Sequence, residues 1–101
     1  MTHRKLQSCV IVTFRHKGLR DLFHTGRSAK VPSHLRERCA DMLDILDEAM
    51  TLQEINIPGF DFHPLLQFKP VRYSIHVNGP WCITFEWVAP NVFRVDLEQY
   101  H

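Results

Sequence analysis

Histidines, cations and tyrosines in the C-terminal part of this 101-residue chain match the groups that RNA cleavage without a metal requires. They include Arg72 and His76 on a predicted strand, His63 and Lys69 before it, and Tyr100 and His101 at the end. In such cleavage the 2′-hydroxyl attacks the neighbouring phosphate, which needs a base, an acid for the leaving 5′-oxygen, and cations for the added charge. Histidine titrates near neutral pH and can serve as acid or base. An aromatic ring such as Tyr73 or Tyr100 can stack on a base of the RNA.

The same residue types commonly have no chemical role. His63 precedes a proline and can simply cap a turn, and His76 can be an exposed strand residue. The sequence contains no Gly-rich phosphate loop, nucleophile elbow or carboxylate pair placed for glycoside chemistry. The cysteines Cys9, Cys39 and Cys82 are widely spaced, with no Cys-x-x-Cys and no zinc-ligand spacing. We therefore expect reduced, mostly buried thiols, and neither a metal nor a cofactor.

Runs of alternating apolar residues indicate the strands that position these groups. Residues 72–77 and 82–87 each alternate with a period of two, and Asn78-Gly79 between them is a strong hairpin signal. A third run, 92–97, follows another turn. The polar residues expected together on the sheet face away from the helices are Arg72, Ser74, His76, Cys82, Thr84 and Glu86. The pattern predicts an α+β fold, an antiparallel β-sheet meander with two N-terminal helices packed on one face.

The two helices and a first strand are expected upstream of this sheet. Residues 10–14 are rich in β-branched side chains and predict a strand. Leu19, Leu22 and Phe23 follow at helical spacing, and Gly26 suits the end of that helix. A second, amphipathic helix follows Ser33, whose hydroxyl we expect to cap its first turn. The predicted order is β-α-α-β-β-β, with a further short strand at 62–66.

The length, hydropathy and charge of the chain indicate how many domains it forms, where in the cell it resides and what kind of partner it can bind. We expect one domain over residues 1–101, with 1–9 as an N-terminal extension. No apolar run approaches the roughly 20 residues that span a bilayer, so we expect a cytoplasmic protein without membrane contact. Residues 1–38 hold nine Lys or Arg and two Asp or Glu, a net charge of +7, and residues 39–101 hold three and nine, a net of −6. The basic part either faces an anionic partner or is neutralised by the acidic part.

Several short motifs occur in an order that resembles a known family. They are Phe14-Arg15-His16-Lys17-Gly18-Leu19, Leu22-Phe23, Thr25-Gly26, Ile57-Pro58-Gly59, His63-Pro64-Leu65, Arg72-Tyr73-Ser74-Ile75, Trp81-x-Ile83-Thr84-Phe85 and the terminal acidic-x-Tyr100-His101. Together they resemble the HigB-type toxins of the RelE/ParE superfamily, over roughly residues 10–101. Each motif alone is only moderately specific, whereas their common order is hard to obtain by chance.

The resemblance implies a microbial-RNase-like α+β fold and a place in a type II toxin-antitoxin system. The implied partner is a cognate helix-turn-helix (HigA-like) antitoxin, and operator DNA is contacted only through the antitoxin complex. The implied activity is metal-independent endonucleolytic cleavage of mRNA on the translating ribosome, which inhibits translation. By position, His63 and His101 are implied as acid and base, Arg72 as a phosphate contact, and Tyr100 as a positioning residue.

Three positions depart from the pattern of active members. Leu66, Pro80 and Cys82 stand where we expect Lys, Asn and Arg. Losing a cation at the scissile phosphate costs on the order of 10²–10³ in rate, so the departures predict an attenuated nuclease or a rearranged site. Lys69 has the reach to replace the missing Lys. Two alternatives remain open: a ParE-like inhibitor of DNA gyrase, or a catalytically degenerate protein that only binds its antitoxin.

Overall fold

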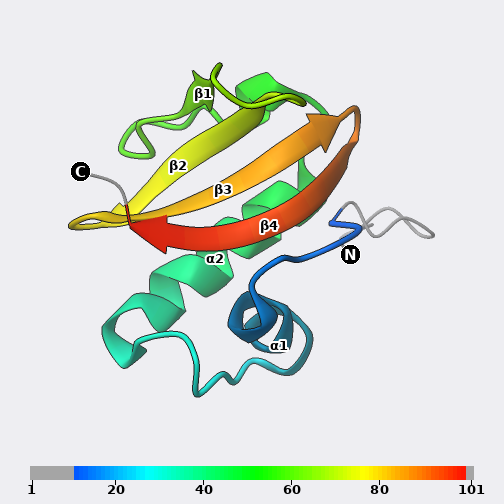
Figure 1. Ribbon diagram of the computed structural model, residues 1–101. Helices are drawn as coiled ribbons and strands as arrows, with labels where there is room; N and C mark the ends of the chain where they lie inside the picture. The colour runs from blue at the N-terminus through cyan, green and yellow to red at the C-terminus, as the bar shows by residue number, and fades with distance from the viewer. Residues whose placement is uncertain (1–10, 100–101) are drawn as a thin grey trace.

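The computed structural model describes residues 11–99, which form two helices followed by a four-stranded antiparallel sheet (Figure 1). The helices are α1 (Lys17–Thr25) and α2 (Arg36–Glu48), with short 3-10 turns η1 (Ser33–Leu35) and η2 (Leu52–Glu54). The strands are β1 (His63–Leu65), β2 (Arg72–Asn78), β3 (Trp81–Val88) and β4 (Asn91–Gln99), paired in chain order. The predicted α+β meander is confirmed. The predicted extension 1–9 and the site residues Tyr100 and His101 lie outside the described residues.

The hydrophobic core lies between the helices and one face of the sheet, here called the inner face. Figure 1 shows α2 passing behind the strands, with α1 beside it on the same side. The buried α2 residues are Cys39, Met42, Leu43 and Leu46. Opposite them, Ile75, Ile83 and Phe85 are fully buried on β2 and β3. Burying a large apolar side chain stabilises the fold by about 1.5–3 kcal/mol each, so this layer supplies most of the stability. None of the helices in the described part of the chain is long and apolar enough to cross a membrane.

The His-Lys-Gly-Leu motif at the start of α1 has a structural explanation. His16 Nδ1 accepts a hydrogen bond from the Leu19 amide at 3.0 Å and so caps the helix. A Cβ atom on Gly18 would lie 2.8 Å from the Lys30 Cβ and 2.9 Å from the Ser28 Oγ, so only glycine fits there. The helix ends as predicted at Gly26, which adopts the left-handed conformation at φ 78°.

Two expectations about the N-terminal half are wrong. Ser33 makes no capping hydrogen bond through its side chain, because a 3-10 turn begins there and Leu35 precedes α2 as its N-cap. Residues 11–14 form no strand and make only two isolated parallel bridges with β4. The β4 backbone bulges at Arg94, where φ is 52°, and the bulge interrupts the ladder that a longer strand would need. The 62–66 strand is confirmed in shorter form as β1.

Candidate active site on the outer face of the sheet

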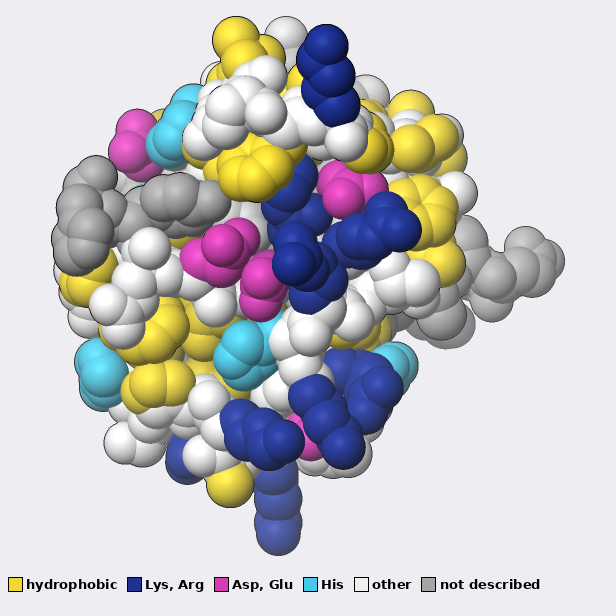
Figure 2. Space-filling model, in the orientation of Figure 1, with side chains coloured by type: hydrophobic (Ala, Val, Ile, Leu, Met, Phe, Trp, Pro, Cys, Tyr) yellow, Lys and Arg dark blue, Asp and Glu magenta, His cyan; other side chains and the backbone are white. Residues whose placement is uncertain are grey.

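The face of the sheet turned away from the helices, here called the outer face, collects the polar residues that the alternation predicts. Residues directly opposite in an antiparallel pair point to the same side. Arg72 is opposite Glu86, Ser74 opposite Thr84, and His76 opposite Cys82, so the predicted grouping is confirmed. Figure 2 shows this face: acidic side chains lie beside a central group of Lys and Arg side chains.

Arg72 is the centre of a hydrogen-bonded network on this face. Its side chain is 3% exposed, and Nη1 donates to the Glu86 Oε2 at 3.1 Å. Nη2 donates to the Thr84 Oγ1 at 3.0 Å and to the Arg94 carbonyl at 2.8 Å. Nε is buried and has no hydrogen-bond partner within the described part of the chain. A buried cation is stable only when it is paired, so Glu86 is what permits Arg72 to lie here.

The network extends to an exposed cation on β4. Arg94 Nη1 donates to the second Glu86 oxygen, Oε1, at 3.0 Å, and the Arg94 side chain is 59% exposed. The backbone of Arg94 is held from both sides, because its amide donates to the Thr13 Oγ1 at 2.8 Å and its carbonyl accepts from Arg72. One carboxylate therefore serves two guanidinium groups, and Arg94 remains only partly neutralised.

At its other end the network reaches a carboxylate. The Thr84 hydroxyl accepts from Arg72 and donates to the Glu98 Oε2. Glu98 lies on β4 in register with Cys82, which itself lies in register with His76. The chain of hydrogen bonds from Arg94 through Glu86, Arg72 and Thr84 to Glu98 thus begins and ends on β4.

Among the described residues, His63 and His76 lie on this face, and their rings differ in which nitrogen is free to bind a ligand. His63 is exposed at the start of β1, and its Nδ1 lies 2.8 Å from the Asp61 carbonyl oxygen. A carbonyl only accepts, so Nδ1 carries the proton and Nε2 is left to take one up. The His76 ring instead uses Nε2 on the Gly79 carbonyl at 2.8 Å, within its own hairpin. His63 is therefore better placed than His76 to exchange protons with a ligand.

Comparison with known proteins decides the family. A model of the family described as RelE-like toxin of type II toxin-antitoxin system HigB matches residues 12–101. The chain belongs to this HigB-like toxin family. A relative from Proteus vulgaris described as Endoribonuclease HigB is 34% identical over 92 residues, which cover 91% of this chain and all of the relative. Membership in a type II system implies a cognate antitoxin.

Three of the predicted site residues, His63, Lys69 and Arg72, lie in the described part of the chain. His63 and Arg72 lie on adjacent strands of the outer face, whereas Lys69 is exposed in the loop between them. Arg72 directs its donors to Glu86, Thr84 and the Arg94 carbonyl. Tyr100 and His101 lie outside the described residues, so their positions relative to His63 stay predictions.

Tyr73 is not available for stacking on an RNA base, contrary to the expectation. Its ring lies parallel to the Phe62 ring, with centroids 5.6 Å apart, and 5.8 Å from the Phe85 ring. Tyr73 is paired with Phe85 in the sheet register and therefore belongs to the inner face. The period of two already indicated this, because Tyr73 alternates with Arg72 and Ser74.

Two of the atypical positions of this toxin differ in exposure. Cys82 is 9% exposed on the outer face, in register with His76 and Glu98. Leu66 is 72% exposed in the loop after β1, where a Lys would also be solvated. Among residues 11–99, no group of three or more His, Cys, Asp or Glu is arranged to hold a metal ion.

Neither Arg94 nor Glu98 was among the predicted site residues, although Glu98 is the acidic residue of the terminal motif. Both lie in the last strand, where burial falls on Val92, Val95 and Leu97. The change in spacing between apolar residues, from three to two, is the signal of a bulge that could have placed Arg94 on the outer face.

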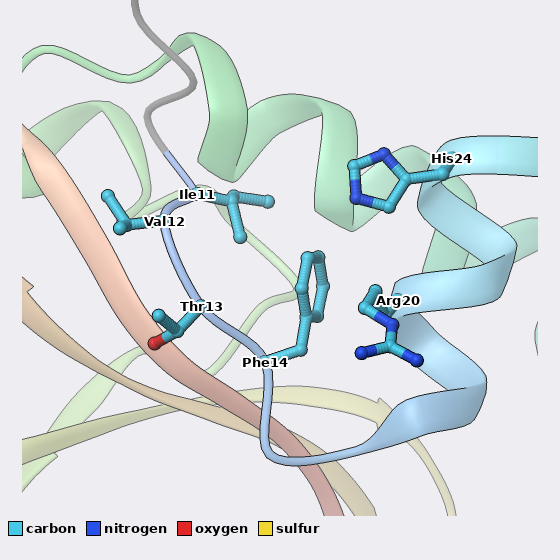
Figure 3. Close-up of a pocket in the computed structure, with 6 residues that line it drawn as sticks. All are labelled: Ile11, Val12, Thr13, Phe14, Arg20 and His24. Carbon is cyan, nitrogen blue, oxygen red and sulfur yellow. The ribbon is translucent and has the colours of Figure 1, made fainter.

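A concave region lies at the edge of the molecule beyond β4. Figure 3 shows the segment 11–14 facing α1, with the Phe14, Arg20 and His24 side chains directed into the space between them. Phe14 also contacts the Phe23 and His24 rings, with centroids 5.8 and 6.1 Å away. This pocket contains none of the predicted site residues.

Proposed function

We propose that this toxin is an mRNA endoribonuclease that acts on the translating ribosome, in the cytoplasm, without a metal. RNA supplies its own nucleophile, the 2′-hydroxyl, so the protein has to supply proton transfer and positive charge. His63 and His101 are the proposed acid and base, Tyr100 positions the RNA, and Lys69 contacts a phosphate.

The observation that carries the proposal is the outer face itself. It presents an open His63 Nε2 on the same sheet face as a network of two arginines. Further Lys and Arg side chains gather over α1 and the loop after it, on the same side of the molecule (Figure 2). Exposed basic residues of this segment are Lys17, Arg20, Arg27 and Lys30. A polyanion held by them would lie close to the outer face. The Proteus vulgaris relative is described as an endoribonuclease, which supports the same activity.

The proposed enzyme is attenuated relative to members with the full set of cations. Leu66 and Cys82 supply no charge, and Arg72, which was expected to contact a phosphate, spends its donors on Glu86 and Thr84. In the cell, a helix-turn-helix antitoxin binds and neutralises the toxin, and the complex of the two represses the operon by contacting operator DNA.

The proposal is tested by mapping mRNA 5′ ends after the toxin is induced without its antitoxin. We expect new ends inside coding regions, only on translated messages. His63→Ala should reduce them strongly, because general acid–base catalysis contributes about 10²–10⁴-fold. His34→Ala, at an exposed histidine of η1, is the matched control and should cleave like the parent. Growth arrest without new ends would contradict the nuclease and favour gyrase, to be checked in a supercoiling assay. Neither arrest nor new ends would leave a protein that only binds its antitoxin.

A further inference from the structure

The outer-face network ends in Arg94 and Glu98, two groups that retain charge or hydrogen-bonding capacity for a ligand. Arg94 is 59% exposed, and it shares the single carboxylate of Glu86 with the buried Arg72. Glu98 accepts one hydrogen bond, from the Thr84 hydroxyl, and forms no ion pair with a cation in the described part of the chain. One end of the network is thus a solvated cation, and the other a carboxylate with acceptor capacity to spare.

We propose that these two ends contact the RNA: Glu98 is the base that takes the proton from the attacking 2′-hydroxyl, and Arg94 is the cation that binds the scissile phosphate. This inference rests on the proposed nuclease function, and it gives Glu98 the base role that the proposed function assigns to one of the two histidines. Neither residue belongs to the set that the sequence indicates, and Arg94 provides positive charge in a toxin that has Leu66 and Cys82 at two cation positions.

The chemistry balances with these two groups and one histidine. The 2′-O–H bond breaks and its proton passes to a Glu98 carboxylate oxygen. The 2′-oxygen forms a bond to phosphorus, and the bond from phosphorus to the 5′-oxygen breaks. The 5′-oxygen takes a proton from the protonated histidine, the role that the proposed function gives to His63 or His101. The products are a 2′,3′-cyclic phosphate and a 5′-hydroxyl, and Arg94 offsets the extra phosphate charge between them.

The network holds both groups in place before the RNA arrives. The Thr84 hydroxyl has a fixed orientation, because it accepts from Arg72 and must therefore direct its proton to Glu98. Arg94 is fixed at three points: its amide on Thr13, its carbonyl on Arg72 and its guanidinium on Glu86. Groups that are already oriented need no reorganisation during the reaction, which is the main advantage of such a site. Arg72 and Thr84 act as positioning residues.

Strain in the backbone supports a role for Arg94 beyond packing. Its φ of 52° lies in the left-handed region, which an arginine adopts at a cost that glycine avoids. The ion pair with Glu86 joins an exposed guanidinium to a buried carboxylate that Arg72 already shares, so it offsets only part of that cost. An arginine retained in such a conformation is typical of a residue whose side chain has a task.

The experiment is single-turnover cleavage of one defined message on purified translating ribosomes, at saturating toxin and over a range of pH. Glu98→Gln keeps the shape and an acceptor for Thr84, and we expect the rate to fall about 10²–10³-fold with loss of the decline at acid pH that reports protonation of the base. The groups facing Glu98 across the sheet are Thr84, Cys82 and His76. Arg94→Gln should lower the rate on the order of 10²-fold, with partial recovery in Arg94→Lys.

Two control variants show whether the effects of Glu98→Gln and Arg94→Gln are specific to these positions or follow from any change in the net charge of the protein. Asp96→Asn removes the neighbouring carboxylate of β4, and Arg27→Gln removes an exposed cation from the loop after α1. Asp96→Asn should cleave at the parental rate, and Arg27→Gln should change only the toxin concentration needed for saturation. Thermal unfolding and antitoxin binding establish that every variant is folded.

The outcomes are distinct. If folded Glu98→Gln keeps the parental rate and pH profile, Glu98 is not the base. If folded Arg94→Gln keeps the parental rate, Arg94 does not bind the scissile phosphate. An equal loss in Asp96→Asn also overturns the assignment of Glu98. A parent that cleaves no message at all refutes the proposed function, and the inference with it.

Discussion

The two faces of the sheet are both largely buried, but by different means. On the inner face, apolar residues such as Ile75 and Phe85 are covered by α2. On the outer face no helix lies over the strands (Figure 1), yet Arg72 is 3% and Thr84 0% exposed. These polar groups bury one another through hydrogen bonds and ion pairs. Apolar packing tolerates small errors, whereas a buried polar network requires every partner, so the inner face provides stability and the outer face provides fixed geometry.

The largest effect is expected on the inner face. Phe85 is fully buried and contacts the Tyr73 ring, so Phe85→Ala should lower the free energy of unfolding by about 3–5 kcal/mol through lost burial and the cavity left behind. Urea denaturation followed by circular dichroism measures it. A loss below about 1.5 kcal/mol would mean that the inner face is not the main source of stability.

Breaking the outer-face network should cost somewhat less. Glu86→Leu leaves the buried Arg72 guanidinium without its carboxylate, although the Thr84 hydroxyl and the Arg94 carbonyl still accept from it. We expect a loss of about 3 kcal/mol in the free energy of unfolding. The double variant Arg72→Met/Glu86→Leu removes both charges and should recover to within about 1 kcal/mol of the parent, because a buried ion pair contributes little net stability.

The rate of RNA cleavage by the same double variant shows whether the outer-face network matters for activity. If the outer face serves geometry rather than stability, the recovered protein should remain folded and bind its antitoxin, yet cleave poorly. Recovery of both stability and cleavage would show that the network is dispensable. If the double variant does not recover stability, the network itself contributes to the stability of the fold.

The distinction between the faces follows from periodicity and could be read from the sequence, whereas the network could not. Strict alternation over residues 72–77 and 82–87 predicts that Arg72 and Glu86 share a face, whereas the exact register that places them opposite each other depends on an irregularity between His76 and Asn78. Alternation fails in β4, where the bulge at Arg94 shifts the later residues by one position. The Thr13 hydroxyl that supports this bulge lies 81 residues earlier in the chain, and no local pattern predicts such a contact.

A smaller effect of the opposite sign is expected at the bulge. Arg94→Gly relieves the strain of a positive φ and removes a half-exposed ion pair whose Glu86 carboxylate keeps Arg72 as a partner, so it should raise the free energy of unfolding by about 0.5–1 kcal/mol. The same variant should cleave RNA poorly if Arg94 contacts the substrate. Asp61→Gly, at the other non-glycine residue with positive φ in residues 11–99, is the matched control for strain. A variant that is both less stable and fully active would contradict the idea that stability is given up here for function.

The smallest effect distinguishes the two buried cysteines, one associated with each face. Burial of the Cys39 thiol against the inner face raises its pKa from 9.0 to about 11, although the nearby Arg38 charge acts in the opposite direction. In the unfolded chain the thiol loses its proton at lower pH than in the folded one, so Cys39 adds no pH dependence below about pH 9 and destabilises the fold as pH rises from 9 through 11.

Urea midpoints at pH 8, 9 and 10 should therefore fall less steeply in Cys39→Ala than in the parent, even though the alanine variant is slightly less stable at pH 8. Cys82→Ala, on the outer face, is the matched control, and other groups that titrate in this range cancel in the difference between parent and variant. Equal slopes for Cys39→Ala and the parent would mean that water reaches the Cys39 thiol. The helix layer would then exclude solvent less completely than the hydrogen-bonded outer face does, which would reverse the contrast between the two sides of the sheet.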